Sequence, residues 1–307
     1  MPILIEDYRS TPSLDSELAD LGYAAVHGWP DQRPVTPSMV RSLLRPGGMT
    51  ATTLALRRDR DGRLVGAAAL RWPATISASG RLWGPVVHPS ARRGGIGREL
   101  LSTLIEVAGS HPGVRFTTTE IPESRAEGWK LFEQLGWRKE TPCTLLARPL
   151  PAGLHVSTTV PVRAAAPGEY LDKALAELFA LARPHLCQSI ARDTFARWKA
   201  DARYTSDGLL LTGDTDRLRG AVLVYPSRHS GPSEPAEALL SDILVDTKLD
   251  PADAAEIRTA LVAAALTMAD GSGAEVFRAV VDNPELRATL QAMGFAEVDR
   301  IRHYVSA

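Results

Sequence analysis

A glycine- and arginine-rich segment near position 95 has the residue types and spacing of an anion-binding turn. The apolar residues Val86 and Val87 lead into it, and the apolar positions of an amphipathic helix begin directly after it. Glycines let backbone amides come close to a bound group, a helix N-terminus supplies unpaired N–H groups with partial positive charge, and arginine adds net charge. A pyrophosphate is the ligand that such a cradle fits best. The cradle residues are Arg92, Arg93, Gly94, Gly95, Ile96, Gly97 and Arg98.

The order of the glycines excludes two common phosphate-binding motifs. The dinucleotide fingerprint GxGxxG is absent, and no Gly-Lys-Ser/Thr follows as it does in a P-loop. A tight, solvated, basic turn without a ligand is the alternative interpretation, because isolated glycine patterns are weak motif evidence. A nucleotide-binding protein is a further alternative, although no carboxylate stands at a spacing suited to a ribose or Mg²⁺.

The wider context of the turn resembles the GNAT superfamily of acyl-CoA-dependent N-acetyltransferases. Arg92-x-x-Gly95-x-Gly97 follows Val87-x-Pro89, and further along the chain a helix ends in Phe132-x-x-x-Gly136-Trp137. The resemblance covers residues 64–139 well and the second half of the chain only in outline. It implies a sheet that is splayed after the strand preceding the turn, with acetyl-CoA in the gap, and direct transfer of the acetyl group to an amine.

The resemblance also implies roles for individual residues of the turn. The amides from Arg93 to Arg98 would hold the CoA pyrophosphate, and Arg92 or Arg93 would pair with the phosphates. Val86 and Val87 would hydrogen-bond the pantetheine chain and help to polarise the acetyl carbonyl. The expected cofactor-binding residues are therefore Val86, Val87, Arg92, Arg93, Gly94, Gly95, Ile96, Gly97 and Arg98.

The catalytic groups of the family are only partly present. Many members carry a Tyr, four residues before the Gly-aromatic pair, that protonates the leaving thiolate, but this chain has Phe132 there; the Asn often found earlier in that helix is Arg125. The general acid is therefore unassigned. Glu120 is the candidate general base, acting directly or through a water, and an exposed strand-end carboxylate is the alternative. We expect His88 to be a turn residue rather than a base.

Candidate contacts for the acceptor amine lie in the segment from His27 to Pro34. In the resembled family the loop between the first two helices covers the acceptor, so Trp29 and Asp31 are the candidate residues for a hydrophobic, amine-bearing molecule. Packing of Trp29 on the sheet edge is the alternative. We expect no metal, because the two cysteines, Cys143 and Cys187, form no CxxC or Cys/His cluster.

The elements that position these residues follow from hydrophobic periodicity. Leu64 to Arg71 and Leu82 to His88 have the composition of strands on either side of a turn-rich segment. Apolar residues recur at helical spacing from Leu100 to Ala108, and the Thr-rich segment from Val114 to Glu120 alternates as a strand does. Strands alternating with helices predict an α/β (α+β) fold, with helices packed on a sheet.

Two helices have recognisable ends. Ser124-Arg125-Ala126-Glu127 fits a capping box, and Gly136 fits the C-terminal stop of the same helix. In the second half Asn283 as N-cap, Pro284 at the first helical position and Gly294 at the end predict the same construction.

The length of the chain predicts two domains. At 307 residues it is about twice the usual domain size. The segment from Arg148 to Gly153 holds two prolines and a glycine, which are typical of a linker. We therefore expect one domain at 1–150 and another at 151–307.

A faint internal repeat relates the two halves. Gly66 in an apolar strand has a counterpart in Gly220, and the helix ending at Gly136 has a counterpart ending at Gly294, at nearly equal distances along the chain. Such equal spacing indicates a duplication. The chain is therefore identified as a tandem form of the resembled family, with two GNAT-like domains, each a splayed mixed sheet with helices on both faces.

The second half has carboxylates where the anion cradle would lie. From Val245 to Glu256 there is no glycine. Asp250 as N-cap, with Asp253 and Glu256 in the early turns, would satisfy and neutralise the N-terminus of that helix. We therefore expect one acetyl-CoA per chain, bound by the first half, and a degenerate second domain.

Composition and net charge limit the classes of binding partner that we expect. The chain is 44% hydrophobic and 23% charged, as globular proteins with a core are, and its 35 Lys+Arg against 36 Asp+Glu give a charge of −1. We expect a cytoplasmic monomer or homodimer that binds acetyl-CoA and a small-molecule or peptide amine, and neither nucleic acid nor membrane. A non-catalytic acyl-CoA-binding module is the alternative function, which the phenylalanine at position 132 keeps open.

Overall fold

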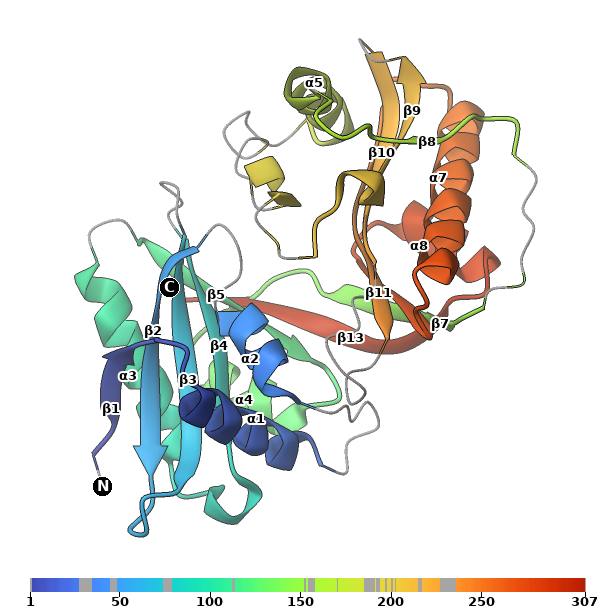
Figure 1. The fold of residues 1–307 in the computed structure, drawn as a ribbon. Helices are drawn as coiled ribbons and strands as arrows, with labels where there is room; N and C mark the ends of the chain where they lie inside the picture. The colour runs from blue at the N-terminus through green and yellow to red at the C-terminus, as the bar shows by residue number, and fades with distance from the viewer. Residues whose placement is uncertain are drawn as a thin grey trace. The chain divides into compact units, whose positions relative to one another are not determined.

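Two compact units make up the fold (Figure 1). The first is built on residues 1–142 and 300–307, and the second on residues 143–229 and 235–299. The computed structural model describes residues 2–27, 35–44, 49–73, 79–111, 114–151, 153, 158–169, 171–184, 191, 194–196, 198–199, 201, 203–214, 217–226 and 236–306.

The first unit is a mixed sheet with helices on both faces. Its strand order is β1-β2-β3-β4-β5-β13, and only the β4–β5 pair is parallel. Helices α1 and α2 cover one face, over a core that includes Leu18 and Leu54. Helices α3 and α4 cover the other face, over Leu104 and Phe132. The elements are β1 (Leu4–Asp7), α1 (Pro12–Val26), α2 (Pro37–Leu44), β2 (Met49–Arg58), β3 (Leu64–Pro73), β4 (Ser79–Val87), the short 3-10 helix η1 (Pro89–Ala91), α3 (Ile96–Ser110), β5 (Phe116–Pro122), α4 (Ala126–Gln134), β6 (Arg138–Lys139) and the last part of β13 (Ala296–Val305).

The second unit repeats this plan. Its strand order is β7-β12-β11-β10-β9-β8, and β11 and β12 are the parallel pair. Helices α7 and α8 cover one face, over Leu261 and Phe277, and α5 covers the other, over Leu178 and Leu211. The elements are β7 (Cys143–Pro149), β8 (Arg163–Ala164), α5 (Asp172–Ala182), η2 (Ser206–Gly208), β9 (Leu209–Asp214), β10 (Arg217–Tyr225), β11 (Glu237–Val245), α7 (Pro251–Gly271), β12 (Val276–Val281) and α8 (Pro284–Ala292).

Each half of the chain gives its last strand to the sheet of the other unit. β7 follows α4 in the chain but pairs with β12, whereas the end of β13 follows α8 but pairs with β5 and β6 in the first unit. The segment predicted as a linker therefore begins inside β7. Arg148 there is buried and donates a hydrogen bond to the carbonyl of Met293, so the prediction that Arg148 and Pro149 are linker residues is wrong.

In the first sheet the parallel strands separate after three paired positions. β4 and β5 pair from Ser79↔Phe116 to Arg81↔Thr118 only. β4 also carries one extra residue around Gly84 and Pro85, where its register against β3 shifts. Such a bulge bends a strand and redirects its side chains. The predicted splay of the sheet after this strand is confirmed.

The second sheet separates in the same way. β11 and β12 pair from Glu237↔Val276 to Leu240↔Ala279 and no further. β11 has a bulge of its own, because Leu223↔Asp242 is followed by Val224↔Leu240. Two splayed mixed sheets with helices on both faces confirm the predicted tandem fold class.

The helices before the buried aromatics end alike in the two units. Gly136 has φ 78° and Gly294 has φ 83°. The amide of Trp137 donates to the carbonyl of Phe132 (3.1 Å), and the amide of Phe295 does the same to Leu290 (3.1 Å). These bonds close Schellman-type ends, which require the left-handed residue that glycine supplies.

The two helix starts differ in how well they were predicted. Asn283 accepts hydrogen bonds from the amides of Glu285 and Leu286 (both 2.9 Å), as expected of an N-cap. The capping box predicted for α4 is wrong, because the N-cap is Arg125 and no side chain caps it. Glu127 instead pairs with Arg93 (2.8 Å), so its carboxylate does not turn back onto the helix start.

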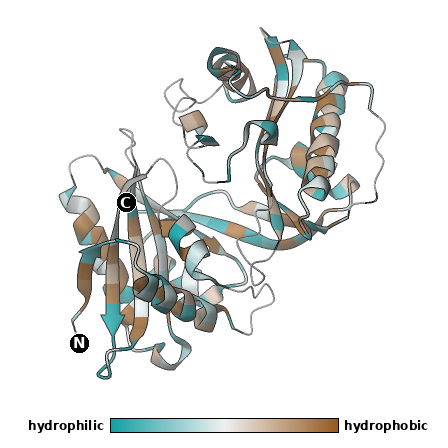
Figure 2. Ribbon diagram, viewed as in Figure 1, coloured by the Kyte–Doolittle hydropathy of each residue, from teal (hydrophilic) through white to brown (hydrophobic). Residues whose placement is uncertain are grey.

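Apolar residues concentrate on the central strands of both sheets (Figure 2). Within the described residues, no helix has the length and apolarity needed to span a bilayer.

Candidate functional site

The turn after β4 presents an open helix N-terminus. The His88 amide donates to the carbonyl of Val65 (2.9 Å) and closes the strand, and η1 then reverses the chain. Arg93 and Gly95 both have positive φ angles, 66° and 80°. This left-handed pair turns the chain into α3 at Ile96, and no side chain caps the helix.

The backbone amides from Arg93 to Arg98 are available to a ligand. None of them donates a hydrogen bond to a described residue. The acidic residue of the first turn, Glu99, is held by Arg57 at 3.0 Å. Unpaired amides at a helix N-terminus carry partial positive charge. This turn can therefore bind an anionic group such as a pyrophosphate.

Gly97 lets α3 approach both β4 and α4. A Cβ at this position would lie 3.3 Å from Cδ2 of Leu131 and 3.5 Å from Cγ of Pro85. Because Pro85 lies in the bulge of β4, the start of α3 is brought against the strand where the sheet is splayed.

The three arginines of the turn have different partners. Arg92 Nε donates to the carbonyl of Val87 (3.3 Å) and its Nη2 to the carbonyl of Ala25 (2.9 Å), so it ties the turn to the end of α1. Arg93 pairs with Glu127, and its side chain is 85% exposed. Arg98 donates to Gln134 Oε1 (3.4 Å) and is also exposed. These contacts favour Arg93 and Arg98 over Arg92 as phosphate partners.

Val86 and Val87 lie on the part of β4 that β5 no longer accompanies. They pair with Ala67 and Gly66 on β3, whereas β5 is paired with β4 only as far as Arg81. The backbone edge of β4 that faces away from β3 is therefore without a strand partner here. The Val87 carbonyl already accepts a hydrogen bond from Arg92.

Glu120 stands in a cluster of charges. It is half exposed on β5, forms an ion pair with Arg81 of β4, and lies 3.9 Å from Nδ1 of His303 on β13. Arg71 of β3 is directly opposite Arg81. Sequence reasoning selected Glu120 but missed the other three, because strands far apart in the chain bring them together.

The position of the missing general acid is apolar. Phe132 is fully buried, with its ring centroid 4.9 Å from that of Trp137 and 5.9 Å from that of Tyr304. The Tyr304 hydroxyl donates to Glu133 Oε1 (2.9 Å). Burial and the bond to Glu133 raise the pKa of Tyr304, so this phenol holds its proton more tightly than usual. The general acid stays unassigned.

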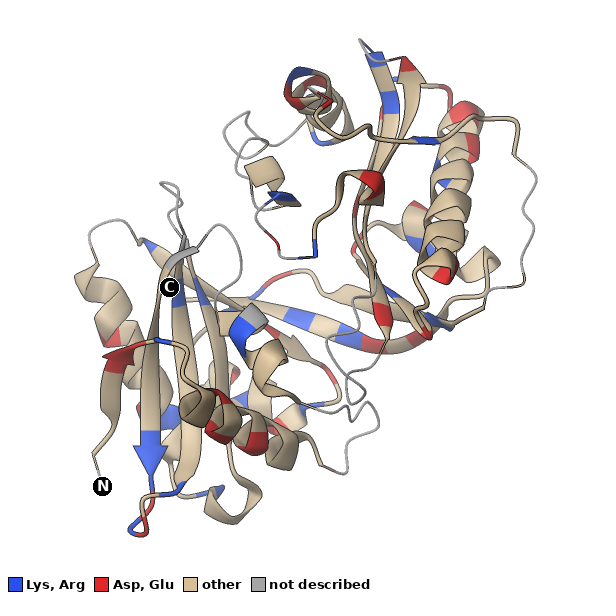
Figure 3. Cartoon of the chain, in the orientation of Figure 1, with Lys and Arg blue, Asp and Glu red and all other residues tan. Residues whose placement is uncertain are grey.

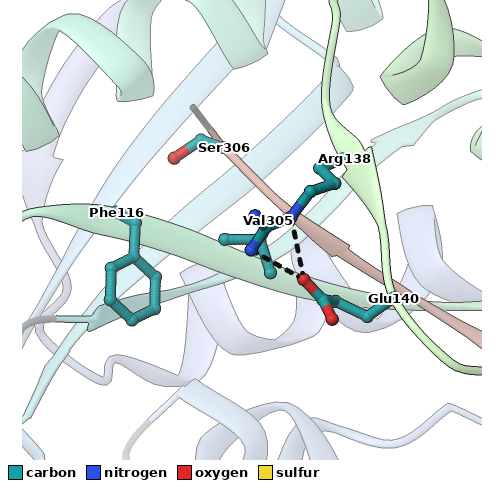
Figure 4. Close-up of a pocket in the computed structure, with 5 residues that line it drawn as sticks. All are labelled: Phe116, Arg138, Glu140, Val305 and Ser306. Atoms are coloured by element: carbon teal, nitrogen blue, oxygen red, sulfur yellow. Dashed lines mark hydrogen bonds and ion pairs between the residues drawn. The ribbon is translucent and has the colours of Figure 1, made fainter.

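Figure 4 shows a pocket of about 460 Å³ on the first unit. Phe116 of β5 and Val305 of β13 form its apolar side, and the Arg138–Glu140 ion pair (2.8 Å) lies beside Val305. Phe116 and Glu120 are an even number of residues apart on one strand, so they share a face of the sheet. Val305 stands opposite Thr118, the residue between them on that face. The pocket and Glu120 therefore lie on the same face.

The corresponding helix start in the second unit is closed by its own carboxylates. Asp250 caps α7 and accepts a hydrogen bond from the amide of Ala252 (2.9 Å), as predicted. Asp253 pairs with Arg219 (3.0 Å). An anion would meet a capped amide and two negative charges there.

The remaining predicted residues have structural positions or fall outside the described part. His88 accepts a hydrogen bond from the amide of Ser90 (3.3 Å), in keeping with a turn residue. Trp29 and Asp31 lie outside the described residues, so their proposed contacts stay predictions. In the part of the chain that the structure describes, no group of three or more His, Cys, Asp or Glu side chains is arranged to hold a metal ion.

Two sheets, each splayed at its parallel pair, with an open helix N-terminus beside one of the separated pairs, are features of the GNAT fold. Residues 22–137 match the model of the acetyltransferase (GNAT) family. The chain as a whole has the tandem GNAT fold.

Solved structures with the same fold align along nearly the whole chain. A tandem GNAT protein from the clavulanic acid biosynthesis pathway has 21% identity and a TM-score of 0.70, covering 99% of this chain and 98% of that one. A GCN5-related N-acetyltransferase from Sphaerobacter thermophilus has 16% identity and a TM-score of 0.71, with coverage of 99% and 95%. The N-myristoyltransferase of Saccharomyces cerevisiae with bound myristoyl-CoA has 12% identity and a TM-score of 0.66, with coverage of 99% and 82%. Among curated proteins none matches the sequence significantly.

Proposed function

We propose that this chain transfers an acetyl group from acetyl-CoA to a primary amine of a small molecule or peptide by direct attack of the amine. The uncapped N-terminus of α3, set at the end of the splayed strand β4, is the observation that supports this most strongly. A pyrophosphate would take the amides from Arg93 to Arg98, with Arg93 and Arg98 supplying charge at the surface. Bound acetyl-CoA supplies an activated acyl carbon to the splay.

Glu120 is proposed as the group that accepts the proton of the amine. It lies on β5 two positions beyond Thr118, where β5 has left β4. A carboxylate held at the splay can take a proton directly or through one water. The ion pair with Arg81 orients the Glu120 carboxylate, and His303 at 3.9 Å is near enough to take the proton onward. In the reaction the N–C bond forms, the C–S bond breaks, and water supplies the proton that the thiolate takes up.

A non-catalytic acyl-CoA-binding module is the second candidate. The buried phenylalanine at position 132 favours it, since no side chain at that position can donate a proton. The ion pair between Glu120 and Arg81 also favours it, because a guanidinium group already occupies the carboxylate oxygen that would take the proton.

Two measurements separate these functions. Incubation with acetyl-CoA and a broad amine panel, followed by detection of free thiol, should give CoA release with at least one amine. Thermal stabilisation by acetyl-CoA, but not by ATP or NAD, should accompany it. Stabilisation without CoA release for any amine would favour the binding module, and stabilisation by ATP or NAD alone would refute both.

The setting of the reaction is also proposed. The near-neutral net charge of −1 supports an enzyme that acts on small molecules or peptides rather than on nucleic acid or a membrane surface. We place it in the cytoplasm, as a monomer or homodimer, with one acetyl-CoA per chain.

A further inference from the structure

Three basic side chains and one carboxylate gather where β4 and β5 separate. Arg71 of β3 is directly opposite Arg81 of β4, and Glu120 of β5 is directly opposite His303 of β13. The ion pair between Arg81 and Glu120 joins the two sets. Figure 3 shows basic residues at the neighbouring ends of β3 and β4. Even with His303 neutral, positive charge exceeds negative charge in this cluster.

Among the described residues, no carboxylate forms an ion pair with Arg71. Its Nη1 donates to the carbonyl of Leu43 (3.1 Å), but its buried Nε has no hydrogen-bond partner among the described atoms. Burial, followed by the neighbouring charge of Arg81, lowers the pKa of Arg71 to about 10, and Glu120 offsets only part of this. Like charges directly opposite one another on antiparallel strands are destabilising. A further anion beside this arginine pair would stabilise both guanidinium groups.

The arginine pair lies close to where the amine must react. Arg81 is the last residue of β4 that pairs with β5. Directly beyond it the two strands separate, and the gap between them is the proposed position of the thioester. Glu120, the proposed proton acceptor, contacts Arg81 itself. An anionic group bound by the pair would therefore lie within a few bonds of an amine placed at Glu120.

We propose that the acceptor carries a carboxylate close to its amine, as an amino acid does, and that Arg71 and Arg81 bind that carboxylate. This rests on the proposed acetyltransferase function. Guanidinium groups suit this task because their planar fork matches the two carboxylate oxygens. Glu120 then faces the ammonium group of the same molecule, so both charges of the acceptor meet an opposite charge.

The pocket shown in Figure 4 gives the rest of such an acceptor a place on the same face of the sheet. Arg81 pairs with Thr118, and Phe116 lies two residues before Thr118 on β5, a distance of roughly 7 Å along the strand. The apolar surface of Phe116 and Val305 thus begins within reach of an acceptor anchored at Arg81. Amino acids with apolar side chains are the expected subset.

The test compares amino acids with their own carboxamides. A panel of apolar and polar amino acids, each matched by the amide and by the decarboxylated amine, is measured with the whole chain for CoA release and, by calorimetry in the presence of acetyl-CoA, for binding. We expect kcat/KM for the best amino acid to exceed that of its amide by about 10- to 100-fold, the range for loss of a charge-assisted hydrogen bond. Equal or better use of the amides, or of phosphorylated amines, would overturn the carboxylate assignment.

Two variants extend the test. Arg81→Gln and Arg71→Gln should each raise KM for the amino acid by about tenfold or more, and Arg71→Gln should leave KM for its amide unchanged. Arg58→Gln is the matched control and should change neither KM: Arg58 lies on β2 of the same sheet and pairs with Glu17 of α1. Amino acids that bind through the arginines without being acetylated would refute the transferase and keep the carboxylate site. Equal acetylation of amines with and without a carboxylate would support the transferase and refute the carboxylate site.

Discussion

Gly66 and Gly220 occupy the same place in the two sheets, each directly beneath the helix that follows the splayed strand. A Cβ at Gly66 would lie 2.7 Å from Cγ2 of Ile96, and a Cβ at Gly220 would lie 2.8 Å from Cγ2 of Ile257. The faint repeat of glycines in the sequence therefore marks a packing requirement: α3 and α7 sit so close to their sheets that no side chain fits between.

Alanine at either glycine should destabilise its unit. Gly66→Ala and Gly220→Ala should each cost about 1–3 kcal/mol, the usual effect of overpacking. Urea unfolding followed by circular dichroism measures this. Gly109→Ala in α3 is the control, because a Cβ there meets nothing within 4 Å; it should stabilise the chain by roughly 0.5–1 kcal/mol through helix propensity. Unchanged stability of both strand variants would show that the helices do not need this close approach.

An acidic side chain in the turn should abolish cofactor binding. Gly95→Asp places a negative charge among the amides that face the pyrophosphate, and a Cβ there meets nothing within 4 Å, so the fold should persist. Calorimetry with acetyl-CoA should show affinity reduced by at least about 100-fold, on the scale of a charged hydrogen bond lost and a repulsion gained.

Gly62→Asp is a closely matched control for this variant. Gly62 has φ 81° against 80° for Gly95, and a Cβ there also meets nothing within 4 Å, but it lies in the turn between β2 and β3. The backbone strain of the substitution is therefore the same in both. Equal loss of affinity in the two variants would place the cause in strain rather than in charge at the cradle.

Turns and helix ends could be predicted from the sequence because they depend on neighbouring residues. The turn at Gly95, the caps at Asp250 and Asn283 and the helix ends at Gly136 and Gly294 depend only on residues a few positions away, so spacing alone revealed them. The capping box at Ser124 failed because Glu127 has a partner outside its helix, at Arg93.

The pairing of strands that are far apart in the chain could not be predicted from the sequence. β13 pairs with β5 although the two strands lie far apart in the chain, and neither periodicity nor turn residues record that pairing. Arg71, Arg81 and His303 consequently gave no signal as neighbours of Glu120, since they come from three strands of unremarkable composition. A charge cluster of this kind becomes visible only when the register of the strands is known.

The second unit should bind no cofactor. Asp250 caps α7 and Asp253 pairs with Arg219, so calorimetry should give one acetyl-CoA per chain. Asp253→Gly should leave the affinity unchanged, whereas Asp250→Ala should cost about 1 kcal/mol of stability through the lost cap, again at constant affinity. A second binding event, or an altered first one in either variant, would contradict the single-site proposal.

The first unit should lose stability in alkali through Tyr8. Its hydroxyl donates to the buried carboxylate of Asp15 (2.6 Å), and burial followed by this bond raises the pKa of Tyr8 to about 12. In the unfolded chain Tyr8 ionises near pH 10. Its contribution to the free energy of unfolding is therefore fully present below about pH 10 and is lost as the pH rises to about 12, a decrease of about 2–3 kcal/mol.

Tyr8→Phe tests that assignment. The variant should be less stable than the wild type at pH 8, because Asp15 loses a hydrogen bond, but its stability should fall less steeply between pH 10 and 12. Tyr23→Phe, which alters a 46% exposed side chain of α1, should keep the wild-type slope. Identical slopes for all three chains in urea unfolding would assign the alkaline loss to other groups.

Removing the carboxylate at position 120 should slow turnover without weakening cofactor binding. Glu120→Gln keeps the size of the side chain but cannot accept the proton of the amine, and general-base catalysis contributes about 10²- to 10⁴-fold. We expect kcat to fall within that range while the calorimetric affinity for acetyl-CoA stays constant. Glu106→Gln, on the exposed side of α3, controls for the loss of one negative charge near the sheet and should behave as wild type.

The same comparison with His303→Gln asks whether the C-terminal strand contributes to the chemistry of the first unit. His303 faces Glu120 across the β5–β13 pair at 3.9 Å, so it can take the proton onward or orient the carboxylate. Either role predicts a smaller fall in kcat than in Glu120→Gln, and no additive loss in the double variant, because both residues serve one proton transfer. Losses that multiply would mean that the two side chains act separately, and a loss confined to KM would reassign His303 to acceptor binding.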